Sequence, residues 1–496
     1  MKHFSSKEEV HNYAIENIVN KPFGELAKEY DIDLSKKKNG IGDLFEACYG
    51  KEKDSASEPD LGVAELKATP YKALSTKNKY SAKERLVLNI INYDELVDES
   101  FNTSHFLHKN KVIELAFYQY LKSVPRSQWT FSHVALFEMS KNPADFAIIK
   151  HDWETIKKYV DEGHADQLSE SLTDYLAACT KGKNRNHRRS QPHSNIKAKQ
   201  RAFSFKAGYM TQLLRKYILG NEENEAIIKD SLSLKNNSLR KIITKKFKPY
   251  IGLTTKQIAA KLGVHNTKSK QFNSLLARKM LGLSSSRKDL KHIDELEKSS
   301  TIIKTIQFDV KGKNKESMSF PAFKFIDLAN ETWEDSDGSP SASFNALLSE
   351  STFVFLVFQR DSHNDNYFRG IKFYNFPREI IDGPIYEEWK SIQNTINDGI
   401  EFTYTEVANK KSPTGFSPKI KNNVPKGNII HIRPHTSVSS YVCNSNSNKL
   451  PTAAHWTNYT EVKDTEKFPK IPQYWTTQCF WLKNTFVRTI VKDLLK

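Results

Sequence analysis

The chain has 496 residues, of which 38% are hydrophobic and 11% aromatic, which is enough apolar material for two domains and excludes a disordered protein. Lys and Arg number 75 against 58 Asp and Glu, and the net charge of +17 indicates a polyanionic partner, with nucleic acid the first candidate. The longest apolar run, FVFLVF at 353–358, is too short to span a membrane, and the four scattered cysteines argue against a disulfide framework or a structural zinc site.

The N-terminal segment is polar and has a helical pattern, which is not typical of a signal peptide. Together with the cysteine usage, this predicts a soluble, cytoplasmic protein.

The first pattern with chemical content is PDLGVAELKATP, residues 59–70. Small or apolar residues alternate here with charged ones, which predicts a strand with Glu65 and Lys67 on the same face. Asp60 precedes the strand, where a turn or a preceding strand could bring its carboxylate alongside.

This group of residues suits metal-assisted phosphodiester hydrolysis. Asp60 and Glu65 offer the hard oxygen ligands that Mg²⁺ prefers, and Lys67 could orient the attacking water and offset phosphate charge. Glu46, at the end of the helical segment GIGDLFE, is a third acid within reach of the same site. The spacing alone is common in a chain rich in Glu and Lys, so the alternative interpretation is a solvated strand edge.

Further along the chain, RLVLNII (85–91) and VIELAFY (112–118) are strand-like, which predicts an α/β or α+β fold with a mixed sheet. Residues 181–200 then form a segment with seven Lys or Arg and no acid. We expect it to contact phosphates or to enter a groove, with a solvated charge run as the alternative. Its candidate DNA-binding residues are Lys181, Arg185, Arg188 and Arg189, since an arginine could also fork onto guanine.

The chain also repeats itself weakly and in register. The intervals from Trp153 to Gly163 and from Trp389 to Gly399 both read as amphipathic helices. FSFKAGY, 203–209, matches FWLKNTF, 480–486, which pairs Lys206 with Lys483. We therefore predict two similar domains, 1–220 and 245–496, joined by a polar linker, 221–244.

Several of these segments, in order, resemble a known nuclease family. GELAKEYDIDLSKKKNGIGDLFEACYG, PDLGVAELKATP, TSHFLHKNKVIELAFY and DWETIKKYVDEGHADQLSE are similar to the mismatch-repair endonuclease MutH over residues 20–220. The duplicated organisation resembles the two-domain, Sau-type type II restriction endonucleases, which cut at GATC. The resemblance implies a PD-(D/E)XK nuclease fold, a requirement for Mg²⁺ and duplex GATC as the substrate, cut before the G.

The same resemblance assigns roles by position. It implies metal-binding acids at Asp60 and Glu65, a catalytic lysine at Lys67, a helix acid at Glu46 and a further active-site lysine at Lys109. The gap between Asp60 and Glu65 is slightly shorter than in MutH. Of the MutH base-reading loop only Lys181 is kept, and Ser204 stands where MutH has a tyrosine. Ser204 and Lys206 are further candidate DNA-binding residues.

The second half lacks the acids of the first. The strand TIIKTIQ, 301–307, keeps Lys304 at the Lys67 position but has Ile302 in place of Glu65, and Arg278 replaces Glu46. Such a site cannot hold Mg²⁺ in the same manner. The segment IIHIRPHT retains Arg433 and His435, so we expect an inactive domain that still binds DNA, together with Lys483.

The leading interpretation is a restriction endonuclease whose second domain binds a second GATC copy and stimulates cleavage, with a DNA-induced homodimer as one route to double-strand cutting. A separate methyltransferase would protect the host DNA. The alternatives are a repair nickase that needs partner proteins and a non-catalytic GATC-binding or methylation-sensing protein.

Overall fold

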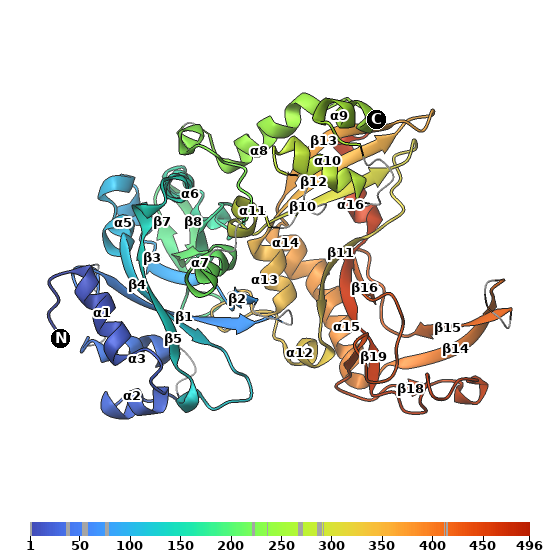
Figure 1. Ribbon diagram of the computed structural model, residues 1–496, viewed down its shortest axis with the longest axis horizontal. Coiled ribbons are helices and arrows are strands. Elements are labelled where there is room, and N and C mark those ends of the chain that lie inside the picture. Colours follow the sequence, from blue (N-terminus) through green and yellow to red (C-terminus); the bar gives the residue numbers. More distant parts are fainter. Residues whose placement is uncertain are drawn as a thin grey trace. The chain divides into compact units, whose positions relative to one another are not determined.

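The computed structural model describes residues 2–35, 40–51, 58–74, 79–220, 224–235, 237–265, 271–284, 290, 292–410, 412 and 415–496. The chain divides into two compact units (Figure 1). Unit 1 comprises residues 1–304, 336–339 and 350–354, and unit 2 comprises residues 305–335, 340–349 and 355–496. No helix in the described ranges has both the length and the apolar content needed to cross a membrane.

Unit 1 contains a mixed sheet with the strand order β2-β1-β4-β5. β1 runs parallel to β4, while the β1–β2 and β4–β5 pairs are antiparallel. β4 is buried along almost its whole length, as expected for a strand covered on both faces. The strands span Glu65–Ala73 (β1), Tyr80–Ala82 (β2), Val112–Gln119 (β4) and Phe131–Glu138 (β5).

Three N-terminal helices share a core with this sheet: α1 (Lys7–Asn17), α2 (Phe23–Glu29) and α3 (Gly40–Cys48). Val10, Leu26 and Phe45 from these helices pack in one cluster with Leu66 of β1 and Phe131 of β5. The packing fixes α3, which carries Glu46, against the strand that carries Glu65 and Lys67.

A second, antiparallel sheet in unit 1 has the order β3-β9-β6. The helix predicted around Trp153 is confirmed as part of α6, which buries Trp153, Ile156 and Val160. Asn142 caps this helix by accepting from the backbone N–H groups of Ala144 and Asp145. The remaining elements of this region are β3 (Leu86–Ile90), α4 (Tyr93–Leu96), α5 (His105–Asn110), α6 (Pro143–Asp161), β6 (Leu176–Thr180), β7 (Arg188–Gln191), β8 (Ser194–Lys199), β9 (Arg201–Phe205) and α7 (Ala207–Leu219).

Residues 221–304 also belong to unit 1. Within the expected linker, 221–244, residues 221–223 and 236 lie outside the described residues, and the rest includes a 3₁₀ turn and the start of α8. The elements are η5 (Ser231–Leu234), α8 (Leu239–Phe247), α9 (Thr255–Leu262), α10 (Phe272–Met280) and α11 (Asp294–Lys298). The compact units thus divide the chain at other positions than the sequence repeat does, and the duplication itself stays a prediction.

Unit 2 holds most of a sheet with the order β10-β12-β13, an antiparallel sheet β11-β20-β16, and the smaller sheets β15-β14-β18 and β17-β19. The helix predicted after Trp389 is confirmed within α15. The strands are β10 (Thr301–Phe308), β11 (Met318–Phe323), β12 (Thr352–Arg360), β13 (Asn366–Tyr374), β14 (Glu401–Ala408), β15 (Phe416–Asn422), β16 (Ile430–Pro434), β17 (Ser447–Lys449), β18 (His455–Trp456), β19 (Tyr474–Thr476) and β20 (Gln478–Leu482). The helices are α12 (Phe325–Asn330), α13 (Ser343–Glu350), α14 (Arg378–Ile380), α15 (Tyr386–Asp398) and α16 (Asn484–Ile490).

The two sequence halves contain sheets of similar order. In β3-β9-β6 and in β11-β20-β16, the strand that is last in the chain lies in the middle and pairs antiparallel with both neighbours. The central strand leads directly into a helix in each case, α7 after β9 and α16 after β20. The predicted α/β class with a mixed central sheet is confirmed.

Candidate active site

A tight turn brings Asp60 to the start of β1. The Gly62 N–H donates to the Pro59 carbonyl at 3.0 Å, and the Leu61 N–H donates to the Ala64 carbonyl at 3.1 Å. Gly62 has φ of +74°, a conformation that glycine adopts without steric cost. The chain therefore reverses between Asp60 and Glu65, so a turn and not a preceding strand brings the two acids together.

Backbone hydrogen bonds hold the two carboxylates in place. The Asp60 N–H donates to Glu65 Oε2 at 3.1 Å, and the Leu66 N–H donates to Asp60 Oδ2 at 3.0 Å. Asp60 is 8% exposed and Glu65 only 1%. Burial raises the pKa of Glu65, while the Lys67 ammonium opposes that rise.

Two lysines approach the same oxygen of Glu65. Lys67 Nζ donates to Glu65 Oε1, and Lys109 Nζ lies 3.7 Å from that atom. Lys67 comes from the same strand face as Glu65, as the alternation predicted, and Lys109 comes from α5. The two ammonium groups offset the charge of a carboxylate that would be costly to bury alone.

Glu46 on α3 is the third acid near this group. Burial and the neighbouring Asp60 carboxylate raise the pKa of Glu46 to about 7, although Lys67 pulls in the opposite direction. A carboxyl with this pKa changes its protonation state near neutral pH, which is a property common at catalytic sites.

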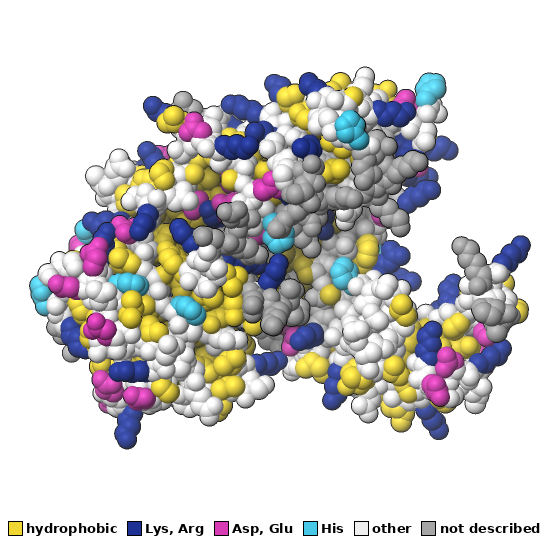
Figure 2. Space-filling view, viewed as in Figure 1, with side chains coloured by type: hydrophobic (Ala, Val, Ile, Leu, Met, Phe, Trp, Pro, Cys, Tyr) yellow, Lys and Arg dark blue, Asp and Glu magenta, His cyan; other side chains and the backbone are white. Residues whose placement is uncertain are grey.

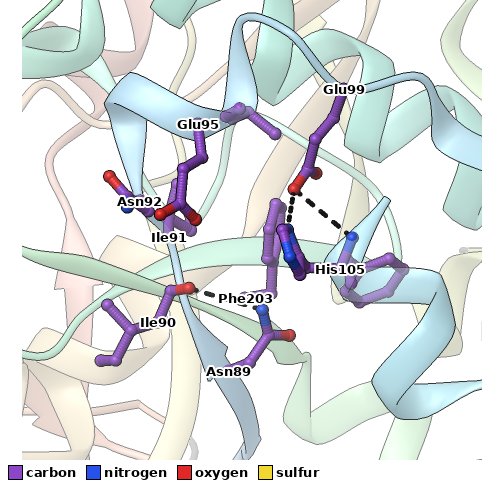
Figure 3. Close-up of a pocket in the computed structure, with 10 residues that line it drawn as sticks. Asn89, Ile90, Ile91, Asn92, Glu95, Glu99, His105 and Phe203 are labelled. Carbon is purple, nitrogen blue, oxygen red and sulfur yellow. Dashed lines mark hydrogen bonds and ion pairs between the residues drawn. The ribbon is translucent and has the colours of Figure 1, made fainter. Parts of the chain in front are cut away.

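The position of Lys109 depends on how α5 is anchored. Ser104 caps the helix by accepting from the Leu107 N–H, and Glu99 accepts from both the backbone N–H and Nδ1 of His105 (Figure 3). The hydrogen bond to Glu99 raises the pKa of His105. At the other end of α5, Asn110 Nδ2 donates to Asn89 Oδ1 of β3 at 2.9 Å.

Two hollows lie beside α5. A cavity of about 30 Å³ is lined by Asn89, Glu99, His105 and Phe203, among others (Figure 3). An open groove of about 330 Å³ is lined by Glu58, Asn102, Thr103, His105, Leu107, His108 and Lys111. The groove lies beside the segment that leads to Asp60, since Glu58 precedes Asp60 by two residues.

A buried ion pair on β4 was not anticipated from the sequence. Glu114, paired in register with Leu66 and fully buried, lies 3.1 and 3.2 Å from His11 Nδ1 on α1. The hydrogen bond raises the pKa of His11, and burial raises that of Glu114. The only signal in the sequence was an acid in the middle of the apolar run VIELAFY.

The basic segment 181–200 forms the hairpin β7–β8 and its approach. Lys181, Arg185 and Arg188 are exposed along it. Arg189 is anchored instead: its guanidinium donates to Asn92 Oδ1 at 3.0 Å and to the Ile91 carbonyl at 3.4 Å. The hairpin therefore presents some of its predicted DNA contacts to solvent and uses Arg189 to attach itself to unit 1.

Ser204 and Lys206 are buried in this structure. Ser204 is fully buried on β9, and the Lys206 ammonium donates to the carbonyls of Thr173, Ser299 and Glu350 at 2.6–3.3 Å. Burial lowers the pKa of Lys206. The structure does not bring these two side chains together with the exposed cations of the hairpin. Both side chains are buried, so their contact with DNA stays a prediction.

The residues that the predicted repeat aligns with the acids of the first half are arranged differently. Arg278 on α10 is fully buried and forms an ion pair with Glu225, whose other oxygen accepts from the Ser284 N–H at 2.8 Å. Lys304 and Ile302 lie on β10. At the positions that the predicted repeat aligns with Glu46 and Glu65, Arg278 and Ile302 thus stand in place of carboxylates.

The predicted DNA-binding residues of unit 2 lie on β16 or directly after β16 and β20. Arg433 is exposed and its guanidinium lies 5.2 Å from the Trp481 ring, and His435 Nδ1 lies 3.3 Å from Cys479 Sγ. Lys483 follows β20 and is half-buried at the N-cap of α16. Burial, with Arg433 and Lys483 nearby, lowers the pKa of His431 to about 4.

The residues at the head of β1 fit a hard divalent cation. Asp60 and Glu65 supply carboxylate oxygens, and the pKa of Glu46 is raised first by burial and then by the Asp60 carboxylate, whose charge a cation would offset. Among the described residues, no group of three or more His, Cys, Asp or Glu side chains could enclose a metal ion. Protein ligation by two carboxylates leaves the remaining positions for water and phosphate oxygens, which is how Mg²⁺ is usually bound.

Comparison with known proteins agrees with this geometry. The family described as DNA mismatch repair enzyme MutH matches residues 49–152. The DNA mismatch repair protein MutH of Pasteurella multocida is 26% identical over 169 residues, covering 33% of this chain and 72% of that protein. The type II restriction enzyme Sau3AI of Staphylococcus aureus is 45% identical over 503 residues, covering 100% of both chains.

The mixed sheet, the acids and lysine of β1 and the MutH match over the same strand define an endonuclease of the PD-(D/E)XK class, as predicted. The full-length match is more specific than the match to MutH. The chain belongs to the family of type II restriction enzymes that includes Sau3AI. It is a site-specific deoxyribonuclease that acts on double-stranded DNA, and restriction endonucleases of this kind generally need a divalent metal ion.

Proposed function

We propose that this restriction endonuclease recognises GATC and cleaves before the G, with Mg²⁺ held by Asp60 and Glu65. The observation that carries the proposal is the convergence of these two buried carboxylates with Lys67 and Lys109 at the head of β1. GATC itself is carried over from the resemblance to the Sau-type enzymes. When bound, the metal ion offsets the charge of the scissile phosphate and activates water.

The remaining groups have distinct tasks in this proposal. Lys67 and Lys109 hold positive charge beside Glu65 and can orient the attacking water or the phosphate. Glu46, with a pKa of about 7, is suited to exchange a proton near neutral pH. DNA phosphates would be contacted by the exposed cations of the β7–β8 hairpin and by the groove beside α5.

Cleavage and binding can be tested separately with Glu65→Ala. This change should abolish cleavage of GATC plasmids in Mg²⁺ and leave binding of a GATC duplex in Ca²⁺ within about threefold of the wild type. Glu16→Ala, at an exposed acid on α1, serves as the control. Near-normal cleavage by Glu65→Ala would overturn the site, and cleavage of plasmids that lack GATC would overturn the specificity.

We further propose that the second half is an inactive copy that binds a second GATC and stimulates the first. Three observations support it: the matching order of β3-β9-β6 and β11-β20-β16, the ion pair that Arg278 makes in place of an acid, and the exposed Arg433. Binding at one site that promotes cleavage at another requires reciprocal coupling.

A plasmid with two GATC sites should then be cut faster than one with a single site, and a short GATC duplex should stimulate cleavage of the single-site plasmid. Arg433→Ala should remove the stimulation and keep basal cleavage. Equal rates on both plasmids, with no response to added duplex, would refute the effector role. Sedimentation with and without duplex tests the DNA-induced homodimer.

We also propose a cytoplasmic location and a separate methyltransferase that protects host GATC sites. Cleavage of plasmids prepared with and without each methylation of GATC identifies the protective modification. A full-length match to a type II restriction enzyme favours this system over a repair nickase or a non-catalytic sensor.

A further inference from the structure

The hairpin β14–β15 in unit 2 is an unusual structural feature. Its base is well packed: Phe402 lies within 5.3–5.6 Å of the rings of Tyr441, Trp456 and Trp475, and Tyr404 lies 5.8 Å from Phe468. β14 pairs with β18 only at Glu401 and Phe402. Beyond Tyr404, the two strands pair with each other alone.

The outer part of the hairpin is exposed on both faces. Four further residue pairs follow, from Thr405–Lys419 to Ala408–Phe416, and at its end Val407 is 40% and Phe416 52% exposed. At about 3.4 Å per residue, this part extends roughly 14 Å before its turn. A two-stranded ribbon without a covering layer is only marginally stable, so a function for the exposed length is to be expected.

The two faces of the ribbon differ in charge. Directly paired residues share a face, so Lys419 and Lys421 lie on the same side as Thr403, Thr405 and Ser417. Both lysines are exposed, and Lys410 is exposed near the turn. The opposite side carries the one acid of the outer ribbon, Glu406, which is neutralised by Lys463. Figure 2 shows Lys and Arg side chains projecting around this arm, at the right of the view.

We infer that the β14–β15 ribbon enters the major groove of the DNA bound by unit 2. The inference rests on the proposed effector function and names the element that would hold the second duplex. The major groove is about 12 Å wide and 8.5 Å deep and admits a two-stranded ribbon, so the exposed length suffices to reach its floor. The lysines match the phosphates at the groove edges. The Thr405 hydroxyl donates to the Lys419 carbonyl at 2.9 Å and can accept from a base edge, and the Ser417 hydroxyl accepts from Asn409 Nδ2 at 2.7 Å and can donate to one.

The exposed lysines have an alternative explanation that involves no DNA. β15 is an edge strand, and exposed lysines on edge strands prevent pairing with other chains. A second copy of the chain is another occupant for an exposed ribbon. Both are distinguishable from DNA binding by experiment.

The test uses the full chain with Lys410, Lys419 and Lys421 changed together to Ala. If these residues contact phosphates, the slope of log affinity against log salt for a second GATC duplex should fall by roughly 2–3, at about 0.9 for each charge. Stimulation by a second site should be lost while cleavage of a single-site plasmid stays within about twofold. The corresponding triple change to Arg should behave like the wild type.

The matched control removes three exposed charges elsewhere in unit 2, by changing Lys311, Lys313 and Lys315 to Ala. It should leave the salt slope and the stimulation unchanged. In the wild type, GATC duplex should also protect Lys419 and Lys421 from acetylation, measured by mass spectrometry, and should leave Lys492 reactive.

The outcomes separate the two proposals. If the wild type shows no stimulation, the effector role fails, and protection of Lys419 and Lys421 alone then decides the ribbon inference. An unchanged salt slope with no protection overturns the ribbon inference, even if Arg433→Ala still removes stimulation. Altered self-association with normal DNA binding also overturns it, because the ribbon would then be a protein contact.

Discussion

The carboxylate cluster at the head of β1 should cost the protein stability, and Glu46→Gln is the change that reveals it. Glu46 has a pKa of about 7 in the folded protein instead of the ordinary 4.5, because of burial and the Asp60 carboxylate. At about 1.4 kcal/mol per pH unit, keeping Glu46 ionised would cost roughly 3 kcal/mol. Glu46 is only partly buried, and solvent screening reduces the expected effect to about 1–2 kcal/mol.

The pH dependence follows from the direction of the shift. Above pH 7, Glu46 is ionised in both the folded and the unfolded state, and the folded state bears the full cost. Between pH 7 and 4.5 the folded state takes up the proton first, so the cost fades, and below pH 4.5 it is gone. Glu46→Gln should therefore stabilise the metal-free protein above pH 7 and have no effect near pH 4.

The assay is thermal unfolding in EDTA at several pH values. For a unit of this size, 1–2 kcal/mol corresponds to a rise of about 2–3 °C at pH 8. The difference from the wild type should shrink in Mg²⁺, because a cation bound by Asp60 and Glu65 relieves the same repulsion. Glu16→Gln, an exposed acid on α1, is the control. No stabilisation at pH 8, or an equal stabilisation at pH 4, would refute this reasoning.

Three further predictions concern other parts of unit 1. Changing Arg185 and Arg188 together to Ala should reduce the salt slope of DNA binding by roughly 2, whereas Arg189→Ala should mainly loosen the β7–β8 hairpin, seen as faster amide exchange there. Lys298→Ala should destabilise the protein by about 3–5 kcal/mol in denaturant titrations, because it leaves the buried Asp145 carboxylate without the ammonium now 2.9 Å away; a smaller loss in the double variant with Asp145→Asn would support this cause. Lys109→Ala should reduce the cleavage rate and leave the affinity for DNA in Ca²⁺ nearly unchanged, since its ammonium faces Glu65. A loss of affinity with a normal cleavage rate would contradict the position of Lys109 in the active site.

The local geometry of the site was predictable from the sequence. Alternation along β1 placed Glu65 and Lys67 on one face, and the position of Asp60 just before the strand allowed a turn to bring it alongside. Lys109 came only from the resemblance to MutH, because it reaches Glu65 from a separate helix more than forty residues away. Contacts of that kind depend on tertiary packing, which spacing along the chain does not encode.

Other features could not be predicted for the same reason. A basic run shows that a surface is cationic, but it does not show that Arg189 turns inward to Asn92 while Arg188 stays exposed. Lys206 resembled a DNA contact in the repeat, yet three backbone carbonyls surround its ammonium. The length over which β14 and β15 pair only with each other depends on where β18 stops, which no local pattern specifies.

The ion pair between Arg278 and Glu225 has an evolutionary consequence. Arg278→Glu would place an acid on α10 but would leave two carboxylates facing each other, one of them at a fully buried position, with no cation between them. Under the proposed duplication, recovery of an acidic site would need Glu225 to change as well, and Ile302 to become an acid. Under the proposal that the second half is an inactive copy, this ion pair would hold the loss of catalysis in place by epistasis and leave that half free to diverge as a binding element.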